Sequence, residues 1–177
     1  LATIDADRVG HDVIAPGGAA AAAVVDAFGE SVTTDGVIDR EKLGARVFDD
    51  PAALQRLNAL THPVIFAEIG RRCQQLTEQG HACVLIDAAL LAEGGQREPF
   101  LAGLIVVHCP ADERLRRMVE DRGMPRHDAE RRLAAQSDPT RKEALADWVI
   151  DNSGTVADLE REVAAVAGEI KARYAAA

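Results

Sequence analysis

Short apolar runs alternate with longer amphipathic segments along the chain. Four runs predict β-strands, at residues 2–4, 83–86, 104–108 and 148–150. Each run ends beside a polar or turn-forming residue, and the segments between the runs show the three- and four-residue apolar spacing of helices. Short, fully apolar strands that alternate with helices are typical of a parallel sheet buried on both faces. The pattern therefore predicts an α/β protein.

Residues 18–80, between the first two strands, are predicted to be nearly all helical. Asp39 and Asp50 suit N-caps, and Pro51 suits the first position of a helix. Pro63 predicts the start of a further helix. Because this insertion is longer than a crossover between neighbouring strands needs, it predicts a helical subdomain attached to the sheet.

A second helical region follows the third predicted strand. Residues 111–136 predict two helices separated near Pro125, and a final helix is expected from about 156 to 174. The chain shows neither an internal repeat nor a low-complexity linker. We therefore expect one domain over residues 1–177, with the helical regions as insertions.

Composition narrows the class of protein. A net charge of −9 argues against a general nucleic-acid binder, which would present a basic face to phosphates. Three widely spaced cysteines, without metal or redox spacing, predict reduced thiols in a cytoplasmic protein. No run is long and apolar enough to predict a membrane span. The composition leaves the oligomeric state open.

Positive charge is concentrated in one segment of this acidic chain. Such a segment indicates a small anionic ligand such as a nucleotide phosphate, although a solvated helix face with ordinary salt bridges is the alternative. The segment contains Arg114, Arg116, Arg117, Arg122, Arg126, Arg131, Arg132, Arg141 and Lys142.

Acidic residues follow the first two predicted strands. Asp5 and Asp7 follow the first, and Asp87 follows the second. Ligands of α/β proteins bind at the carboxyl ends of strands, where a carboxylate can accept a hydroxyl proton or hold a metal through water. The alternative for Asp7 is that it only caps the helix that begins beside it.

A phosphate-binding loop of the form G-x-x-x-x-G-K-[ST] does not occur in the 177 residues. The three lysines, Lys42, Lys142 and Lys171, are not preceded by glycine. Any phosphate contacts from these residues must therefore come from other groups.

Several segments together resemble dephospho-coenzyme A kinase over essentially the whole chain. They are "IDADRVGHDVIAPG", "LNALTHPVI", "VLIDAALLAE", "AAQ" and "ADWVIDNSG", in that order. The resemblance implies a P-loop kinase-like parallel sheet flanked by helices, with residues 18–80 as a coenzyme A-binding insert and 111–136 as a lid. It implies transfer of the ATP γ-phosphoryl group, with Mg²⁺, to the ribose 3′-hydroxyl of dephospho-coenzyme A, the last step of coenzyme A synthesis.

The same resemblance implies roles for individual residues. Asp7 matches the base or orienter of the 3′-hydroxyl. Substrate-binding positions are Asp5, Arg8, His62, Asp87, Leu90 and Leu91. Nucleotide-binding positions are Arg122, Arg126, Asn152 and, for the family's arginine after "AAQ", either Arg141 or Lys142. No metal ligand is assigned.

One departure from the family concerns the beginning of the chain. Family members open with a strand, a "GGIGSGKS"-like loop and a helix, which these 177 residues do not include. That strand lies in mid-sheet, and each buried backbone group left unpaired without it costs about 1–3 kcal/mol. We therefore expect either a truncated sequence or a rearranged sheet, and no kinase activity from these residues alone. The alternatives are a non-catalytic protein that binds coenzyme A-like ligands and another nucleotide kinase.

Overall fold

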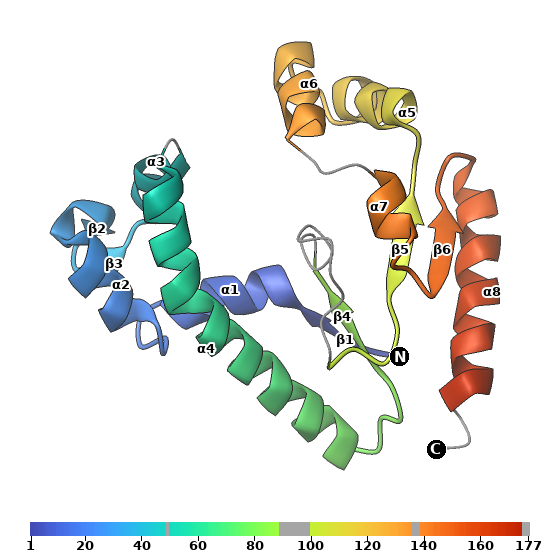
Figure 1. Cartoon of the computed structure of the whole chain (residues 1–177), viewed down its shortest axis with the longest axis horizontal. Helices are drawn as coiled ribbons and strands as arrows, with labels where there is room; N and C mark the ends of the chain where they lie inside the picture. The colour runs from blue at the N-terminus through green and yellow to red at the C-terminus, as the bar shows by residue number, and fades with distance from the viewer. Residues whose placement is uncertain (49, 89–99, 136–138, 175–177) are drawn as a thin grey trace. The chain divides into compact units, whose positions relative to one another are not determined.

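The structure is a computed structural model, and the chain divides into two compact units, Leu1–Ala89 and Leu90–Ala177. Each unit has a pair of parallel strands with helices, which confirms the predicted α/β class (Figure 1). The residues described are 1–48, 50–88, 100–135 and 139–174.

The first unit contains the strands β1 (Ala2–Asp5) and β4 (Val84–Asp87). They pair in parallel, and the register places Asp5 opposite Asp87. Ile4 of β1 is buried against the helices of the unit. The two strands predicted at 2–4 and 83–86 are thus confirmed, each with its end one residue later.

Helix α1 (Ala6–Ile14) follows β1 directly and packs on α4 (Pro51–Glu78). Val9 and Val13 are buried between the two helices, together with Ile69 of α4. The helices are also joined by an ion pair in which Arg72 of α4 lies 2.8 Å from Asp12 of α1. The Glu68 carboxylate accepts a 2.7 Å hydrogen bond from the same Arg72 side chain. This packing fixes the direction in which α1 leaves the strand.

The segment between β1 and β4 is not helical throughout, so that prediction is wrong at residues 33–38. A two-stranded hairpin forms there, because Asp35 and Gly36 both take positive φ, at 51° and 75°. Asp-Gly suits this turn, since its two central residues need the left-handed region. The elements are α2 (Ala21–Phe28), η1 (Glu30–Val32), β2 (Thr33–Thr34), β3 (Val37–Ile38), α3 (Arg40–Phe48) and α4.

Helix α4 continues through Pro63, so the prediction of a separate helix starting there is wrong. Proline removes one backbone donor from the helix, and the Thr61 hydroxyl in the same turn donates to the Leu57 carbonyl at 2.9 Å. The predicted cap is confirmed, because the Asp50 carboxylate accepts from the Ala53 amide at 3.0 Å. Packing of the buried side of α4 outweighs the local cost of the proline.

The second unit is built on β5 (Ile105–His108) and β6 (Trp148–Asp151), which pair in parallel as predicted. Helix α8 (Val156–Tyr174) packs on β6 and buries Val166 and Ile170. A five-residue helix, α7 (Pro139–Glu143), packs against β5 and was not predicted.

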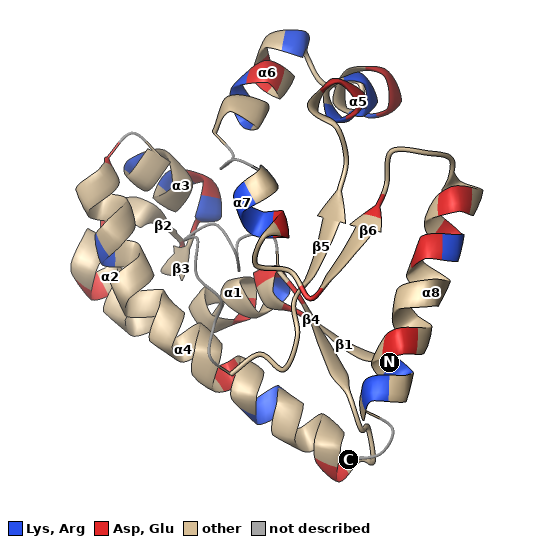
Figure 2. Cartoon of the chain, turned by 45° about the vertical axis from the view of Figure 1, so that its right-hand side comes forward, with Lys and Arg blue, Asp and Glu red and all other residues tan. Residues whose placement is uncertain are grey.

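The two helices predicted within 111–136 are present. They are α5 (Ala111–Arg116), which runs directly into the π-helical turn η2 (Arg117–Asp121), and α6 (Arg126–Ala134). Acidic and basic side chains alternate on both helices (Figure 2). Arg116 forms an ion pair with Glu113 at 2.8 Å. Part of the basic segment is therefore a solvated helix face with ordinary salt bridges, which was the alternative to an anion-binding site.

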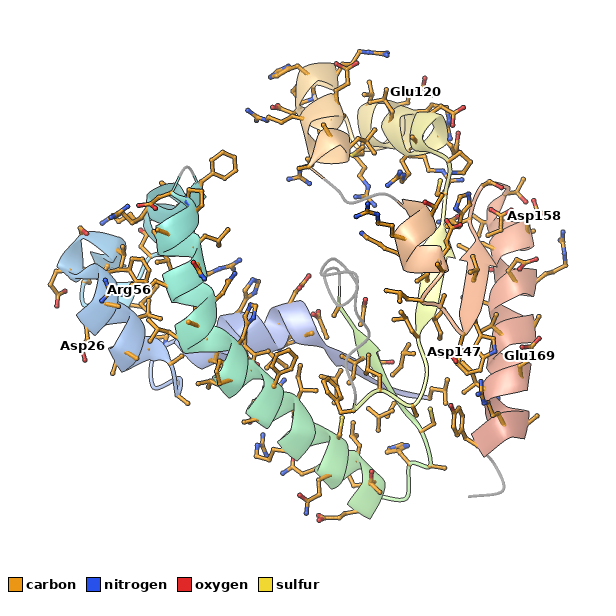
Figure 3. All side chains as sticks on the ribbon, viewed as in Figure 1. Asp26, Arg56, Glu120, Asp147, Asp158 and Glu169 are labelled. Carbon is orange, nitrogen blue, oxygen red and sulfur yellow. The ribbon has the colours of Figure 1, made fainter. Side chains whose placement is uncertain are left out.

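Trp148, at the start of β6, contacts two residues of α8. Its indole N–H donates to the Glu169 carboxylate at 3.0 Å, and the Arg173 guanidinium lies 5.2 Å from the ring centroid. Figure 3 labels Glu169 on α8 and Asp147 just before β6. Gly103 lies against the same ring, and a Cβ there would come within 2.4 Å of the indole. This corner of the second unit therefore requires glycine.

Two further sequence expectations concern the cysteines and the membrane. Cys73, Cys83 and Cys109 are free thiols, and burial raises the pKa of Cys73. Across the described ranges, no helix combines the length and the apolar character that a membrane crossing requires.

Substitution of Asp5 tests how α1 begins. The Asp5 carboxylate accepts from the Arg8 amide at 2.9 Å, so Asp5→Ala should lower the free energy of unfolding of the first unit by about 1 kcal/mol. Asp5→Asn should keep that stability, because asparagine caps as well as aspartate. Urea unfolding followed by circular dichroism measures the change, and the fluorescence of Trp148 reports the second unit as an internal control. Equal stability of the alanine and asparagine variants would contradict the cap.

Glu68 should make the stability of the first unit depend on pH. Hydrogen bonds from Arg71 and Arg72 lower the pKa of Glu68 from 4.5 to about 2. A carboxyl whose pKa is lower in the folded chain stabilises the fold above its ordinary pKa, and that contribution disappears as pH falls through the folded value. Wild type should therefore exceed Glu68→Gln in stability above pH 4.5, with the difference shrinking towards pH 2.

Hydrogen exchange of the α4 amides measures this difference, and Glu78→Gln near the end of the same helix is the matched control. A difference between wild type and Glu68→Gln that stays constant, or grows, as pH falls would show that the Glu68 carboxylate does not brace the helix.

Candidate functional site

The carboxyl end of β1 carries two acids with different surroundings. Asp5 is the N-cap of α1: its backbone is extended, and its carboxylate accepts the Arg8 amide hydrogen bond. Asp7 lies in the first turn of the helix and is exposed. The capping alternative for Asp7 is therefore wrong, since Asp5 is the cap.

The Asp7 carboxylate is available for interactions with a ligand. Among the described residues, none forms a hydrogen bond or an ion pair with it. An exposed carboxylate at a strand end can accept or orient a substrate hydroxyl.

Asp87 brings a third carboxylate to the same edge of the strand pair. It ends β4 opposite Asp5 and is exposed. The structure thus brings together the strand-end acids predicted from the sequence. They do not form a metal site by themselves, because the described part of the chain holds no cluster of three or more side chains arranged to bind an ion.

Arg8 faces a different part of the surface from Asp7. A cavity of about 440 Å³ lies between β1, α1 and the end of α4, and Asp5, Arg8 and Arg72 line it whereas Asp7 does not. No described side chain forms an ion pair with the Arg8 guanidinium. Arg8, predicted to bind substrate, therefore lines this cavity, and Asp7, predicted to be catalytic, does not.

The remaining predicted substrate-binding residues are His62, Leu90 and Leu91. His62 is exposed on α4, and its ring meets Phe66 edge to face, with centroids 6.2 Å apart. No hydrogen bond between His62 and the acids at the ends of β1 and β4 occurs in the described residues. Leu90 and Leu91 lie outside the described residues.

The predicted nucleotide positions all lie in the second unit. Arg122 follows η2 and is exposed, and Arg141 is exposed on α7. Neither guanidinium has a partner among the described residues. Arg126 forms a 2.8 Å ion pair with Glu130 on α6, and Lys142 on α7 is half-buried.

Asn152 begins the loop after β6 and is held at several points. Its backbone amide donates to the His108 carbonyl at 2.8 Å, and its side-chain oxygen accepts from Arg117 at 3.0 Å. Hydrogen bonds from the side chain and backbone of Ser153, with the nearby His108, lower the pKa of Asp151. The loop is therefore built by local polar contacts.

Two contacts in the second unit have no signal in the sequence. Arg117 reaches Asn152 across 35 positions, and His108 at the end of β5 lies 2.5 Å from the Glu143 carboxylate on α7. The basic run near 117 indicated charge but not this partner, and α7 itself was not predicted. The His108 contact ties α7, with Arg141 and Lys142, to the strand end.

Sequence comparison places the chain among known proteins. The family model described as dephospho-CoA kinase matches residues 1–158. The dephospho-CoA kinase of Leifsonia xyli is 41% identical over 167 residues, which are 93% of this chain and 84% of the relative. That of Streptomyces avermitilis is 43% identical over 163 residues, or 90% of this chain and 77% of the relative.

Structure comparison agrees with the sequence matches. The crystal structure of TT1252 from Thermus thermophilus superposes with a TM-score of 0.77 at 30% identity, over 95% of this chain and 84% of that chain. The dephospho-CoA kinase of Campylobacter jejuni gives a TM-score of 0.60 at 26% identity, over 96% and 84%. The chain belongs to the dephospho-CoA kinase family.

Proposed function

We propose that the complete gene product phosphorylates the ribose 3′-hydroxyl of dephospho-coenzyme A with ATP and so forms coenzyme A, and that residues 1–177 alone, which contain no G-x-x-x-x-G-K-[ST] loop, do not catalyse this step. Membership of the dephospho-CoA kinase family supports this reaction. The single structural observation that carries it is the exposed, unpartnered Asp7 carboxylate next to the capping Asp5. This arrangement leaves one acid at the strand end able to meet a hydroxyl.

Asp7 has the role of base or orienter in this proposal. Phosphoryl transfer passes through a loose transition state, so the enzyme contributes mainly positioning and charge stabilisation. Asp7 would accept a hydrogen bond from the 3′-hydroxyl, align its oxygen and take its proton. The bond from this oxygen to the γ-phosphorus forms as the bond from the γ-phosphorus to the β-phosphate oxygen breaks, and ADP leaves. Asp87 at the same strand edge would contact the ribose. Asp5 would affect substrate binding chiefly by holding α1, and with it Asp7, in place.

The other substrate contacts are assigned by position. Arg8 offers an unpaired guanidinium that suits a phosphate of the substrate, and His62 offers an exposed ring on α4. The segment 18–80 would form the coenzyme A-binding insert. Leu90 and Leu91 are proposed as substrate-binding positions on the family resemblance alone.

The nucleotide contacts are assigned to the second unit. Arg122 and Arg141 have no described partners, which suits them to bind ATP phosphates. Arg126 would have to release its ion pair with Glu130 before it could bind a phosphate. Lys142 would offer a single positive charge in place of the two parallel hydrogen bonds that an arginine can donate. Asn152 would contact the base, and residues 111–136 would act as a lid.

Magnesium is expected with ATP in a kinase of this kind. The described residues do not fit a closed protein site for the ion, since they contain no suitable cluster of three ligating side chains. Mg²⁺ would therefore arrive on the ATP phosphates, and no step of the mechanism is assigned to a protein-bound ion.

Two broader expectations belong to the same proposal. We expect the two compact units to work as one catalytic domain over residues 1–177. We place the reaction in the cytoplasm, which is supported by the three free thiols.

The reaction is tested with the purified product of the complete gene, ATP and dephospho-coenzyme A. Phosphorus NMR should show a new 3′-phosphomonoester, together with ADP in equal amount. Adenosine and deoxynucleosides as acceptors should give no comparable product. Turnover of those acceptors alone would indicate another nucleotide kinase, and binding of dephospho-coenzyme A without turnover would indicate a non-catalytic protein.

Substitution of Asp7 tests its role within this reaction. Asp7→Asn keeps the size of the side chain and removes the base, so kcat should fall by about 10²-fold or more. KM for ATP should change little, because ATP is assigned to other residues. Glu160→Gln, at an exposed acid on α8 outside the segments assigned to the substrates, is the matched control and should leave kcat unchanged. Near-normal turnover by Asp7→Asn would remove Asp7 from the mechanism.

A further inference from the structure

All three guanidinium nitrogens of Arg117 donate hydrogen bonds, and two of them hold the loop after β6. One terminal nitrogen donates to the Asn152 side-chain oxygen at 3.0 Å, and the other donates to the Gly154 carbonyl at 3.1 Å. The Nε–H donates to the Glu113 carboxylate at 2.7 Å. The side chain is about three-quarters buried, with 26% of its surface exposed. These contacts link the helix after β5 to the loop after β6.

The chemistry of these groups fixes the orientation of the Asn152 amide. A guanidinium group has only donors, so the side-chain oxygen of Asn152 must face it. The backbone of Asn152 is fixed as well, since its amide donates to the His108 carbonyl. The NH₂ group of Asn152 therefore points away from Arg117, and no described residue accepts a hydrogen bond from it.

Glu113 keeps Arg117 in this position. Its carboxylate also accepts two hydrogen bonds from Arg116, at 2.8 Å each. Hydrogen bonds from Arg116 and Arg117 lower the pKa of Glu113 from 4.5 to about 2. Glu113 is thus ionised at any pH near neutrality, and it anchors Arg117 without touching Asn152.

We propose that Arg117 is a positioning residue for base recognition: it turns the Asn152 amide so that its NH₂ group donates to a ring nitrogen of the adenine of ATP. The proposal rests on the assignment of Asn152 to the nucleotide. Adenine carries ring-nitrogen acceptors that match such a donor. In this proposal Arg117 acts on the base only through Asn152, because its hydrogen bonds to Glu113 and to the loop hold the guanidinium group against those residues.

Deaza analogues of ATP test this proposal, because each replaces one ring nitrogen with a C–H group that cannot accept. In the product of the complete gene, kcat/KM with dephospho-coenzyme A is measured for ATP and for 1-deaza-, 3-deaza- and 7-deaza-ATP. Wild type should discriminate about tenfold against one of the three analogues, the loss of one hydrogen bond. Asn152→Ala should use all four nucleotides within about twofold of one another.

The Arg117 variants should show the same loss of discrimination. Arg117→Ala removes all three contacts, and Arg117→Lys keeps the charge while losing the fork that reaches both Asn152 and Gly154. Both should use the four nucleotides almost equally. Arg116→Ala is the matched control, since Arg116 shares Glu113 but does not contact the loop, and it should keep the tenfold preference.

Three results would overturn the proposal. Equal use of all four nucleotides by wild type would show that the Asn152 amide does not donate to a ring nitrogen. Arg117→Ala and Arg117→Lys variants that lose activity equally on all four, while keeping the tenfold preference, would make Arg117 a structural residue only. Arg116→Ala losing the preference would show that it comes from the helix rather than from the contact with Asn152.

A separate measurement distinguishes this inference from the proposed reaction. Calorimetric binding of ADP and of the matching deaza-ADP requires no turnover. If wild type fails to phosphorylate dephospho-coenzyme A yet binds ADP about tenfold more tightly than one deaza analogue, the reaction is wrong and the Arg117 inference stands. If the reaction occurs and no such difference in affinity appears, the inference is wrong and the reaction stands.

Discussion

The hydrogen bond from the Arg8 amide to the Asp5 carboxylate is the constraint on which the candidate site depends. It ends β1, starts α1 and occupies one of two acids that are only two positions apart. Asp7 is then carried on the first helical turn with its carboxylate exposed. The buried contacts of Val9 with α4 keep the helix in this direction. A cap and a small core thus determine which acid is available to a substrate.

The second unit follows the same physical logic with different groups. Arg117 occupies the oxygen of Asn152 and leaves its NH₂ group available, as the Arg8 amide occupies Asp5 and leaves Asp7 available. In both cases one strong local contact orients a polar group, and the neighbouring group is presented for binding. Such preorganisation lowers the entropic cost of ligand binding.

The sequence was sufficient for features that depend on local pattern. Apolar runs located the parallel strands, and the acid after each run located Asp5 and Asp87 at their ends. It was insufficient where distant packing outweighs local preference, as in α4, which continues through Pro63. Contacts between distant positions, such as Arg117 with Asn152, leave no periodic signal and therefore required the structure.

In the proposed reaction Asp7, and not Asp5 or Asp87, engages the ribose 3′-hydroxyl. A crystal structure of the complete gene product with dephospho-coenzyme A tests this most directly. The 3′-oxygen should lie within about 2.6–3.2 Å of the Asp7 carboxylate, with Asp5 still accepting from the Arg8 amide. A 3′-oxygen bound to Asp5 or Asp87, with Asp7 directed into solvent, would contradict it.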